Sequence, residues 1–190
     1  MQHPLRAMIG LVFCAGLLTA CASGPDGAEM QATFNAGLTQ YDAGNFSAAY
    51  QTWHDIEDVD LAALRNVAIM LRKGQGVEKD LKAARIKMER AANAGLVTAQ
   101  ADLGDMLVND EPRDVAAALP WLARAAAAGH PLAAFQLGKL YESGDGVPKN
   151  LIVARQLYQG AAAAGVEDAA KALQNLPPAP PPSPAVQSSH

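Results

Sequence analysis

Apolar residues recur three and four positions apart along most of the chain, and this spacing predicts amphipathic helices. The first helix is predicted from near Met30 to Gly44, where Gly44-Asn45 is a turn signal. A second helix is predicted over Phe46–Ile56, and a short last one from Glu167 to about Gln174. Between them the pattern predicts six helices, at Asp60–Lys73, Leu81–Ala94, Val97–Val108, Val115–Ala128, Pro131–Ser143 and Leu151–Ala164.

These helices belong to a sequence repeat, which is the feature to establish before any other. Two copies align on Val77 and Val147, and a third lies between them. The glycines that end the copies, Gly95, Gly129 and Gly165, are 34 (129 − 95) and 36 (165 − 129) residues apart. The shorter copy lacks two residues in a turn, where changes of length are tolerated. The first and last copies match at Ala63 and Ala133, Leu71 and Tyr141, Gly74 and Gly144, Gly76 and Gly146, Asp80 and Asn150, and Ala84 and Ala154.

The clearest copy, Gly129–Gly165, contains LGKLY, GDGVPKN and AAAAG in that order. These residues resemble the Sel1-like repeat family, a short relative of the tetratricopeptide repeat. Leu157 replaces the family's tryptophan in this copy. The earliest copy is looser, with Val67-Ala68 at the LG position and Lys87 at the tryptophan position.

The resemblance covers roughly Ala62–Gly165, and Gly37–Trp53 looks more like a degenerate tetratricopeptide-type first unit. It implies an all-α fold: a short right-handed α-solenoid of antiparallel helix pairs with disordered N- and C-terminal tails, usually used to hold proteins together. The solenoid domain is expected at residues 29–176. Its units are expected at about 29–59, 60–95, 96–129 and 130–165, followed by a capping helix at 166–176 that covers the apolar end of the stack.

Residue types at the helix ends support these boundaries. Asp80, Asp114 and Asn150 stand where a side chain can accept hydrogen bonds from the free N–H groups of each second helix. The three terminal glycines stand where a left-handed residue ends a helix. Pro120 lies inside a second helix, which it is expected to kink or to start late.

Residues 1–20 have the pattern of a signal peptide, with Arg6 before an apolar run too short to span a bilayer. The run ends in Leu18-Thr19-Ala20-Cys21, which resembles the bacterial lipobox and implies that Cys21 becomes a lipidated first residue. Residues 21–28 would then be a flexible lipidated tether, and Ala22 resembles a signal for outer-membrane sorting. The alternative is an ordinary signal peptide, or a membrane anchor, with an incidental cysteine.

Processing would remove Arg6 and Cys14, which leaves a charge of 14 − 19 = −5 and Cys21 as the single cysteine. No disulfide could form, so packing must hold the fold. At the other end, residues 177–190 are rich in proline. They are expected to be a disordered tail that could present a binding motif.

Composition limits the classes of function. Half of the 190 residues are hydrophobic but only 5% are aromatic, which suits closely packed alanine and leucine helices. The formal charge is −4 and no basic stripe is present, which argues against a nucleic-acid partner.

No catalytic motif stands out, and an enzyme is the least favoured class. The GxG pairs at Gly74–Lys79 and Gly144–Lys149 are better explained as repeat turns than as phosphate loops, because each follows a helix. His130 lies in the turn GHP, and His54 has no serine or cysteine in a catalytic arrangement. No cofactor, metal or small-molecule substrate is predicted.

The acidic run His54–Asp60 contains residue types of a metal site, but they scatter around a helix end. A solvated junction between units, with Asp60 as the next N-cap, is the favoured interpretation. Trp53 and Trp121 are interpreted as core residues, with an exposed role as partner anchors as the alternative.

The function predicted from this architecture is a lipid-anchored periplasmic scaffold or adaptor within an envelope assembly for secretion, pili or polysaccharide export. The alternative is an accessory protein that docks on peptidoglycan or regulates a cell-wall enzyme. The partners would be envelope proteins, with the membrane reached through the lipid on Cys21. Helical phase alone places the candidate contacts on the first helix of each unit, at Asn66, Met70, Gln100, Asp105, Gln136 and Lys139.

Overall fold

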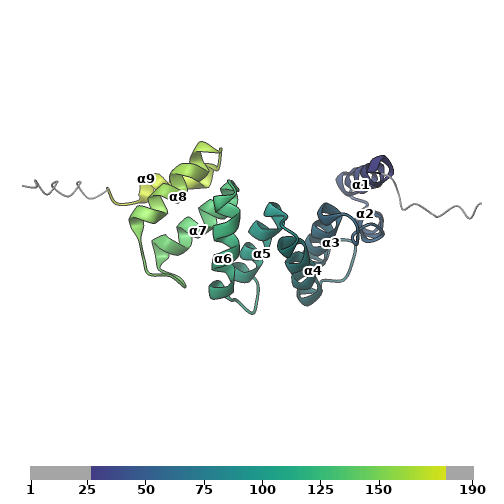
Figure 1. Cartoon of the computed structure of the whole chain (residues 1–190), viewed down its shortest axis with the longest axis horizontal. Helices are drawn as coiled ribbons and strands as arrows, with labels where there is room; N and C mark the ends of the chain where they lie inside the picture. The colour runs from purple at the N-terminus through teal and green to yellow at the C-terminus, as the bar shows by residue number, and fades with distance from the viewer. Residues whose placement is uncertain (1–26, 179–190) are drawn as a thin grey trace, which may run out of the picture.

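The computed structural model describes residues 27–178, and every regular element in that range is an α-helix (Figure 1). The helices alternate between first and second members of a pair, and each packs against the next along the chain. Their bounds are α1 (Gly27–Asp42), α2 (Phe46–His54), α3 (Leu61–Lys73), α4 (Leu81–Asn93), α5 (Val97–Asn109), α6 (Val115–Ala127), α7 (Pro131–Ser143), α8 (Leu151–Ala163) and α9 (Glu167–Asn175).

The predicted all-α solenoid is confirmed, and the repeat helices lie within one or two residues of their predicted ends. Two boundaries differ at the N-terminal side. Helix α1 begins at Gly27, so the last two residues of the predicted tether are helical, and α2 ends at His54 rather than near Ile56. The signal peptide, Cys21 and the tail from Ala179 onward lie outside the described residues.

The predicted caps set the helix ends. The side chains of Asp60, Asp80 and Asp114 accept from backbone N–H groups three residues on, at 2.8, 2.8 and 2.9 Å. Asn150 accepts from two, those of Ile152 and Val153, each at 3.1 Å. A cap of this kind stabilises a helix by about 1 kcal/mol. The terminal glycines have φ of 92°, 85° and 91°, as a left-handed helix end requires.

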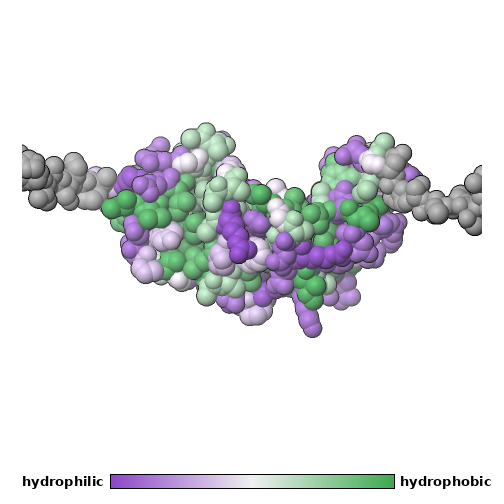
Figure 2. Space-filling model, viewed as in Figure 1, coloured by the Kyte–Doolittle hydropathy of each residue, from purple (hydrophilic) through white to green (hydrophobic). Residues whose placement is uncertain are grey.

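The stack curves along its length. Figure 2 shows the described part bending around a hollow between the α1–α2 end and the α8–α9 end. Helix α9 covers the last pair, with Ala169 buried and Glu167, Asp168 and Lys171 exposed on its outer side. The half-repeat therefore closes the stack with a polar surface, as a capping helix must.

Each pair is locked by a small residue on its first helix facing a large one on its second. A β-carbon on Gly37 would lie 2.4 Å from the Trp53 indole, and one on Gly138 would lie 2.6 Å from the Tyr158 ring. The indole Nε1 donates to the Phe34 carbonyl at 3.2 Å, so burying Trp53 leaves no free donor. This confirms that Trp53 belongs to the core.

The looser second unit uses a different pair. Its Ala68 replaces the glycine, and Met88 stands 20 residues later (88 − 68), as Tyr158 stands 20 after Gly138 (158 − 138). Both Ala68 and Met88 are fully buried. Because methionine is unbranched and flexible, it can pack beside an added methyl group that a rigid ring could not accommodate.

Tyr158 is fixed both by the burial of its ring and by a hydrogen bond of its hydroxyl group. Its ring is fully buried, and its hydroxyl donates to Oε2 of Glu142 at 2.6 Å. Burial and this carboxylate raise the pKa of Tyr158 well above its usual range. The phenol therefore stays protonated and fixes α8 against the end of α7.

The acidic run forms an ion-paired junction between the first two units. Asp60 is the predicted N-cap, but Glu57 is only 6% exposed, so the expectation of a solvated junction is wrong at this residue. Its Oε1 lies 2.5 Å from Nζ of Lys87 and 3.0 Å from Nδ1 of His54. Lys87 occupies the position where the next units have Trp121 and Leu157, so a polar pair here replaces an apolar contact.

Helix α6 contains Pro120 and still begins at Val115, so the expected late start does not occur. Asp114 caps the helix and fixes its first turn before the proline is reached. The neighbouring Trp121 is partly buried against the core, with the Arg124 guanidinium 5.0 Å from its ring centroid.

Candidate protein-binding surface

The first helices of successive units present repeat-equivalent residues on one face. Helices α3, α5 and α7 begin at Leu61, Val97 and Pro131, which are 36 (97 − 61) and 34 (131 − 97) residues apart. These offsets make Asn66, Asp102 and Gln136 equivalent, and likewise Ile69, Asp105 and Lys139. We call the surface formed by these two rows the first-helix face.

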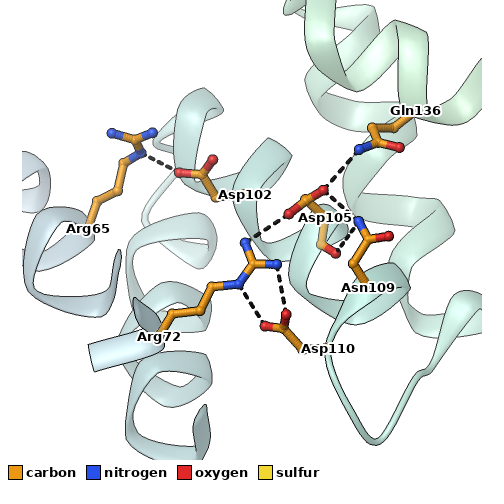
Figure 3. A network of polar contacts seen from close by, with 7 residues as sticks. All are labelled: Arg65, Arg72, Asp102, Asp105, Asn109, Asp110 and Gln136. Atoms are coloured by element: carbon orange, nitrogen blue, oxygen red, sulfur yellow. Dashed lines mark hydrogen bonds and ion pairs between the residues drawn. The ribbon is translucent and has the colours of Figure 1, made fainter. Parts of the chain in front are cut away.

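Two arginines of α3 join it to α5 across this face (Figure 3). Nε of Arg65 donates to Oδ2 of Asp102 at 2.5 Å. Arg72 donates to both oxygens of Asp110, at 2.7 and 2.8 Å, and to Oδ2 of Asp105 at 2.8 Å. A guanidinium that binds a carboxylate through two parallel bonds is fixed in orientation as well as in position.

Burial of Arg72 would by itself lower its pKa, but the hydrogen bonds to Asp110 and Asp105 outweigh that effect and raise the pKa above its usual value. The arginine therefore remains a cation at any physiological pH.

Asp105 extends the network to α7, the first helix of the next unit. Its Oδ1 accepts from Asn109 at 2.7 Å and from the Gln136 amide of α7 at 2.9 Å (Figure 3). Residues 72, 105 and 136 thus link α3, α5 and α7 in one chain of polar contacts. Such a network holds the register of the three units and gives the face a fixed shape.

Hollows lie on the face to either side of this network. One, of about 310 Å³, lies between α1 and α3 and is lined mainly by Leu38, Tyr41, Asn66, Ile69 and Lys73. Two others, of about 330 and 520 Å³, lie between α5 and α7. The α1–α3 hollow is largely apolar, although Lys73 and Asp42 also line it.

Four of the six predicted contact residues lie on this surface. Asn66 lines the α1–α3 hollow, and Asp105 and Gln136 line the 330 Å³ hollow between α5 and α7. Lys139 lines the 520 Å³ hollow, with its ammonium 5.8 Å from the Phe135 ring centroid. Helical phase therefore placed these four residues on one face, although they line different hollows. Whether a partner contacts them stays a prediction.

The other two residues are placed differently from the expectation. Met70 lines the α1–α3 hollow but is only 1% exposed, so it belongs to the core and offers a partner almost no surface. The Gln100 amide donates to the Ala92 carbonyl at 3.2 Å, so this side chain contacts the end of α4. Gln100 lies two residues before Asp102, which puts it roughly 200° around the helix from the face.

Asp105 was among the predicted contacts, but the two arginines and the carboxylates of Asp102 and Asp110 were not. Arg65 and Arg72 are seven residues apart, and Asp102 and Asp105 three apart, so each pair follows one helix face. Aligning the first helices side by side would have placed the two arginines opposite the aspartates. Opposite charges at facing positions of α3 and α5 indicate this network, and the periodicity of one helix taken alone does not contain that information.

Replacing Arg72 with lysine is expected to lower the free energy of unfolding by about 1 kcal/mol, because an ammonium cannot reproduce the paired bonds to Asp110. Urea unfolding followed by circular dichroism would measure it. The matched control is Arg90→Lys, since Arg90 and its partner Asp58 are both well exposed. An equal response of the two variants would contradict a special role for the Arg72 bonds.

Other kinds of site find little support in the described part. None of the helices in residues 27–178 is long and apolar enough to cross a membrane. In the same range no group of three histidine, cysteine or acidic residues is arranged to hold a metal ion. The GxG segments form the turns between α3 and α4 and between α7 and α8, as predicted.

Comparison with known proteins gives three matches to the Sel1 repeat model, at residues 61–96, 97–130 and 131–166. A Sel1 repeat protein of Oxalobacter formigenes has a similar structure, with TM-score 0.68 and 31% identity over 74% of this chain and 58% of that one. The c5321 antigen of uropathogenic Escherichia coli, described as having an SLR fold, gives TM-score 0.69 and 25% identity over 76% of this chain and 32% of that one.

Among curated proteins, mouse DAP3-binding cell death enhancer 1 is 39% identical over 89 residues, which are 47% of this chain. The match spans 18% of the mouse protein, so the similarity covers only a small part of that protein. Proteins of this repeat class mediate protein–protein interactions and are typically non-catalytic. With more than half of its residues matched by three consecutive repeats on a fitting helical stack, the chain belongs to the Sel1 repeat family.

Proposed function

We propose that the chain is a protein-binding adaptor whose partner lies along the first-helix face. The observation that carries this proposal is the α3–α5–α7 network, in which Arg72, Asp105 and Gln136 fix three units into one surface. Hollows open on both sides of it. A rigid surface of this kind loses little conformational freedom when a partner binds.

The proposed place of action is the periplasmic side of a bacterial envelope membrane, within an assembly for secretion, pili or polysaccharide export. The support is Leu18-Thr19-Ala20-Cys21 after an apolar segment, which fits lipid attachment at Cys21. Acyl chains would anchor the protein, since each buried methylene contributes about 0.8 kcal/mol. The helical stack would then present its face to proteins of that compartment.

Crosslinking in living cells, followed by affinity capture and mass spectrometry, tests the adaptor. The triple variant Asn66→Ala, Gln136→Ala, Lys139→Ala is expected to reduce the yield of a defined envelope protein by roughly tenfold. The matched control is Gln156→Ala, Gln159→Ala, since both residues are exposed on α8, a second helix. Equal loss in both variants, or none in either, would count against binding through the first-helix face.

The Cys21→Ser variant tests the anchor separately. We expect it to lose incorporation of a labelled fatty acid, and undiminished incorporation would contradict lipidation at this residue. Purified full chain mixed with isolated cell-wall sacculi tests the alternative. Sedimentation with sacculi together with an absence of any captured protein would favour peptidoglycan docking over the adaptor.

A further inference from the structure

The two seams between neighbouring first helices are closed differently. In the α3–α5 seam, Arg65 and Arg72 of α3 reach across to two carboxylates of α5 and to that of Asp110, just past its end. The equivalent positions on α5, 36 residues later, are Ala101 and Val108. Neither of these side chains can reach α7 as the arginines reach α5, so the α5–α7 seam lacks the two bridging cations.

Hollows occur where the bridging arginines are missing. Ala101 lines the 330 Å³ hollow between α5 and α7, and Val108 lines a second one of about 520 Å³ farther along the same seam. The comparison of the repeats therefore explains both hollows. The two arginines of α3 fill these positions in the α3–α5 seam, whereas Ala101 and Val108 of α5 leave them open in the α5–α7 seam.

The hollow at Ala101 has a mainly apolar side and an acidic side. Leu132, Ala133 and Phe135 of α7 form the apolar part, and Leu132 is 57% exposed although it is a large hydrophobic residue. His130 and Gln136 also line the α7 side. Asp102 and Asp105 of α5 stand opposite. A side chain with an aliphatic stem and a cationic head would satisfy both sides.

The acidic side has remaining capacity for a donor. Asp102 uses one oxygen, Oδ2, for Nε of Arg65. A carboxylate has two oxygens and about four acceptor positions, so its Oδ1 can accept from a further cation. The Asp105 oxygens are shared among Arg72, Asn109 and Gln136, which makes Asp102 the better acceptor.

The second hollow has the opposite character. Arg113, Lys139 and Lys149 line it together with Asp145 and Glu142. Asp145 is already paired with Arg113 at 2.7 Å, and Glu142 accepts from Tyr158. A cationic guest is therefore favoured at the Ala101 end of the seam and disfavoured at the Val108 end.

From this charge complementarity we propose that the hollow lined by Ala101, Asp102, Leu132 and Phe135 binds an arginine side chain of the protein partner. The guest fills the space that is left open at Ala101, the position equivalent to Arg65, with its stem against Leu132 and its guanidinium on Asp102. Lys139 lies over the Phe135 ring, so the cation belongs at the carboxylate and not on that ring. This inference rests on the proposed adaptor function and specifies the chemistry of its partner.

The test is a titration of the ¹⁵N-labelled full chain, followed by NMR, with two peptides. One is acetyl-Ala-Leu-Arg-Leu-Ala-amide, and the other replaces arginine with citrulline, which has nearly the same shape and no charge. We expect the arginine peptide to shift amide signals of residues 101–105 and 130–136, and to bind about tenfold more tightly than the citrulline peptide.

Two variants locate the binding. Asp102→Asn is expected to remove most of the preference for arginine over citrulline. Leu132→Ser is expected to weaken both peptides, and because Leu132 is largely exposed this change should leave the fold intact. The matched control is Asp168→Asn, since Asp168 is an exposed carboxylate paired with Lys171 on α9. It should bind as the parent does.

Equal affinity for the two peptides, shifts confined to other helices, or no shift at millimolar peptide would overturn the inference. A lysine peptide that binds as tightly as the arginine peptide would overturn the choice of arginine while keeping a cation in the hollow. If the partner captured in cells still depends on Asn66, Gln136 and Lys139 while the peptides do not bind, the adaptor stands and this inference fails.

Discussion

Replacing Lys87 with methionine is expected to destabilise the fold by about 3–5 kcal/mol, the usual cost of leaving a buried carboxylate without its cation. Glu57 is 6% exposed, and its Oε1 lies 2.5 Å from Nζ of Lys87. Within the described residues its Oε2 has no hydrogen-bond partner, so the His54 ring, 3.0 Å from Oε1, is the contact that remains when the lysine is removed. Chemical unfolding of the purified full chain would measure the loss.

The double variant Glu57→Met, Lys87→Met shows whether the ion pair itself stabilises the fold or only compensates for the burial of the Glu57 charge. Apolar replacements of buried ion pairs are often neutral or stabilising, so the double variant is expected within about 1 kcal/mol of the parent or above it. Lys171→Met is the exposed control, because Lys171 and its partner Asp168 are both about two-thirds exposed. A single variant as stable as the parent would show that Glu57 reaches water or another donor.

This pair also ties the first unit to the second. Glu57 lies in the connection between α2 and α3, and Lys87 lies on α4. In the Lys87→Met variant, amide hydrogen exchange is expected to quicken first in α1 and α2, since the junction that holds them is loosened. Uniform quickening over all helices would instead mean that the four units unfold together.

The helical framework was accessible from sequence because the local and the long-range signals agree. An N-cap aspartate marks the start of α4 and of α6, a left-handed glycine marks where each ends, and the 34- to 36-residue period agrees with both limits. The described start of α1 was missed because Gly27 and Ala28 carry no apolar period. Because no capping residue marks the start of α1, the glycine there was interpreted as part of the flexible tether.

The binding surface was only partly accessible, for a geometric reason. Helical phase separates the buried stripe from the outer one but cannot tell which flank of a helix faces its predecessor. Gln100 lies on the flank that contacts α4, and Met70 lies at the edge of the buried stripe and packs in the core. Placing Asn66, Asp105 and Gln136 correctly required only the outer stripe, whereas the Arg72 network required the spacing between neighbouring units.

The buried pair of Glu57 and Lys87 shows a different limit. The sequence marked Lys87 as a departure at the tryptophan position, and it marked Glu57 as one acid among several. Nothing in a single sequence joins the two, which are 30 residues apart (87 − 57) in different units. Only the stacking of α4 beside the α2–α3 connection brings the two side chains together, and there their opposite charges compensate each other.

Replacing Gly138 with alanine is expected to destabilise the fold by about 2 kcal/mol, although alanine favours helices. Two effects compete. In an exposed helix, glycine to alanine gains roughly 1 kcal/mol. At Gly138 the added β-carbon would lie 2.6 Å from the Tyr158 ring, and forcing extra volume into a packed core costs about 1–3 kcal/mol. The ring is held at its hydroxyl by Glu142, so it cannot yield freely, and overpacking should win.

Gly160→Ala is the matched control, because Gly160 is also helical, on α8, and nothing lies within 4 Å of its β-carbon position. It should raise the unfolding midpoint by a few degrees while Gly138→Ala lowers it. Adding Tyr158→Met to Gly138→Ala reproduces the Ala68 and Met88 pair of the second unit and should recover most of the loss. The remaining deficit would include the lost bond from Tyr158 to Glu142 and the lost ring contact with Phe135. If the double variant recovers nothing, small-against-large pairing is not what locks the units, and the second unit must be stabilised by other contacts.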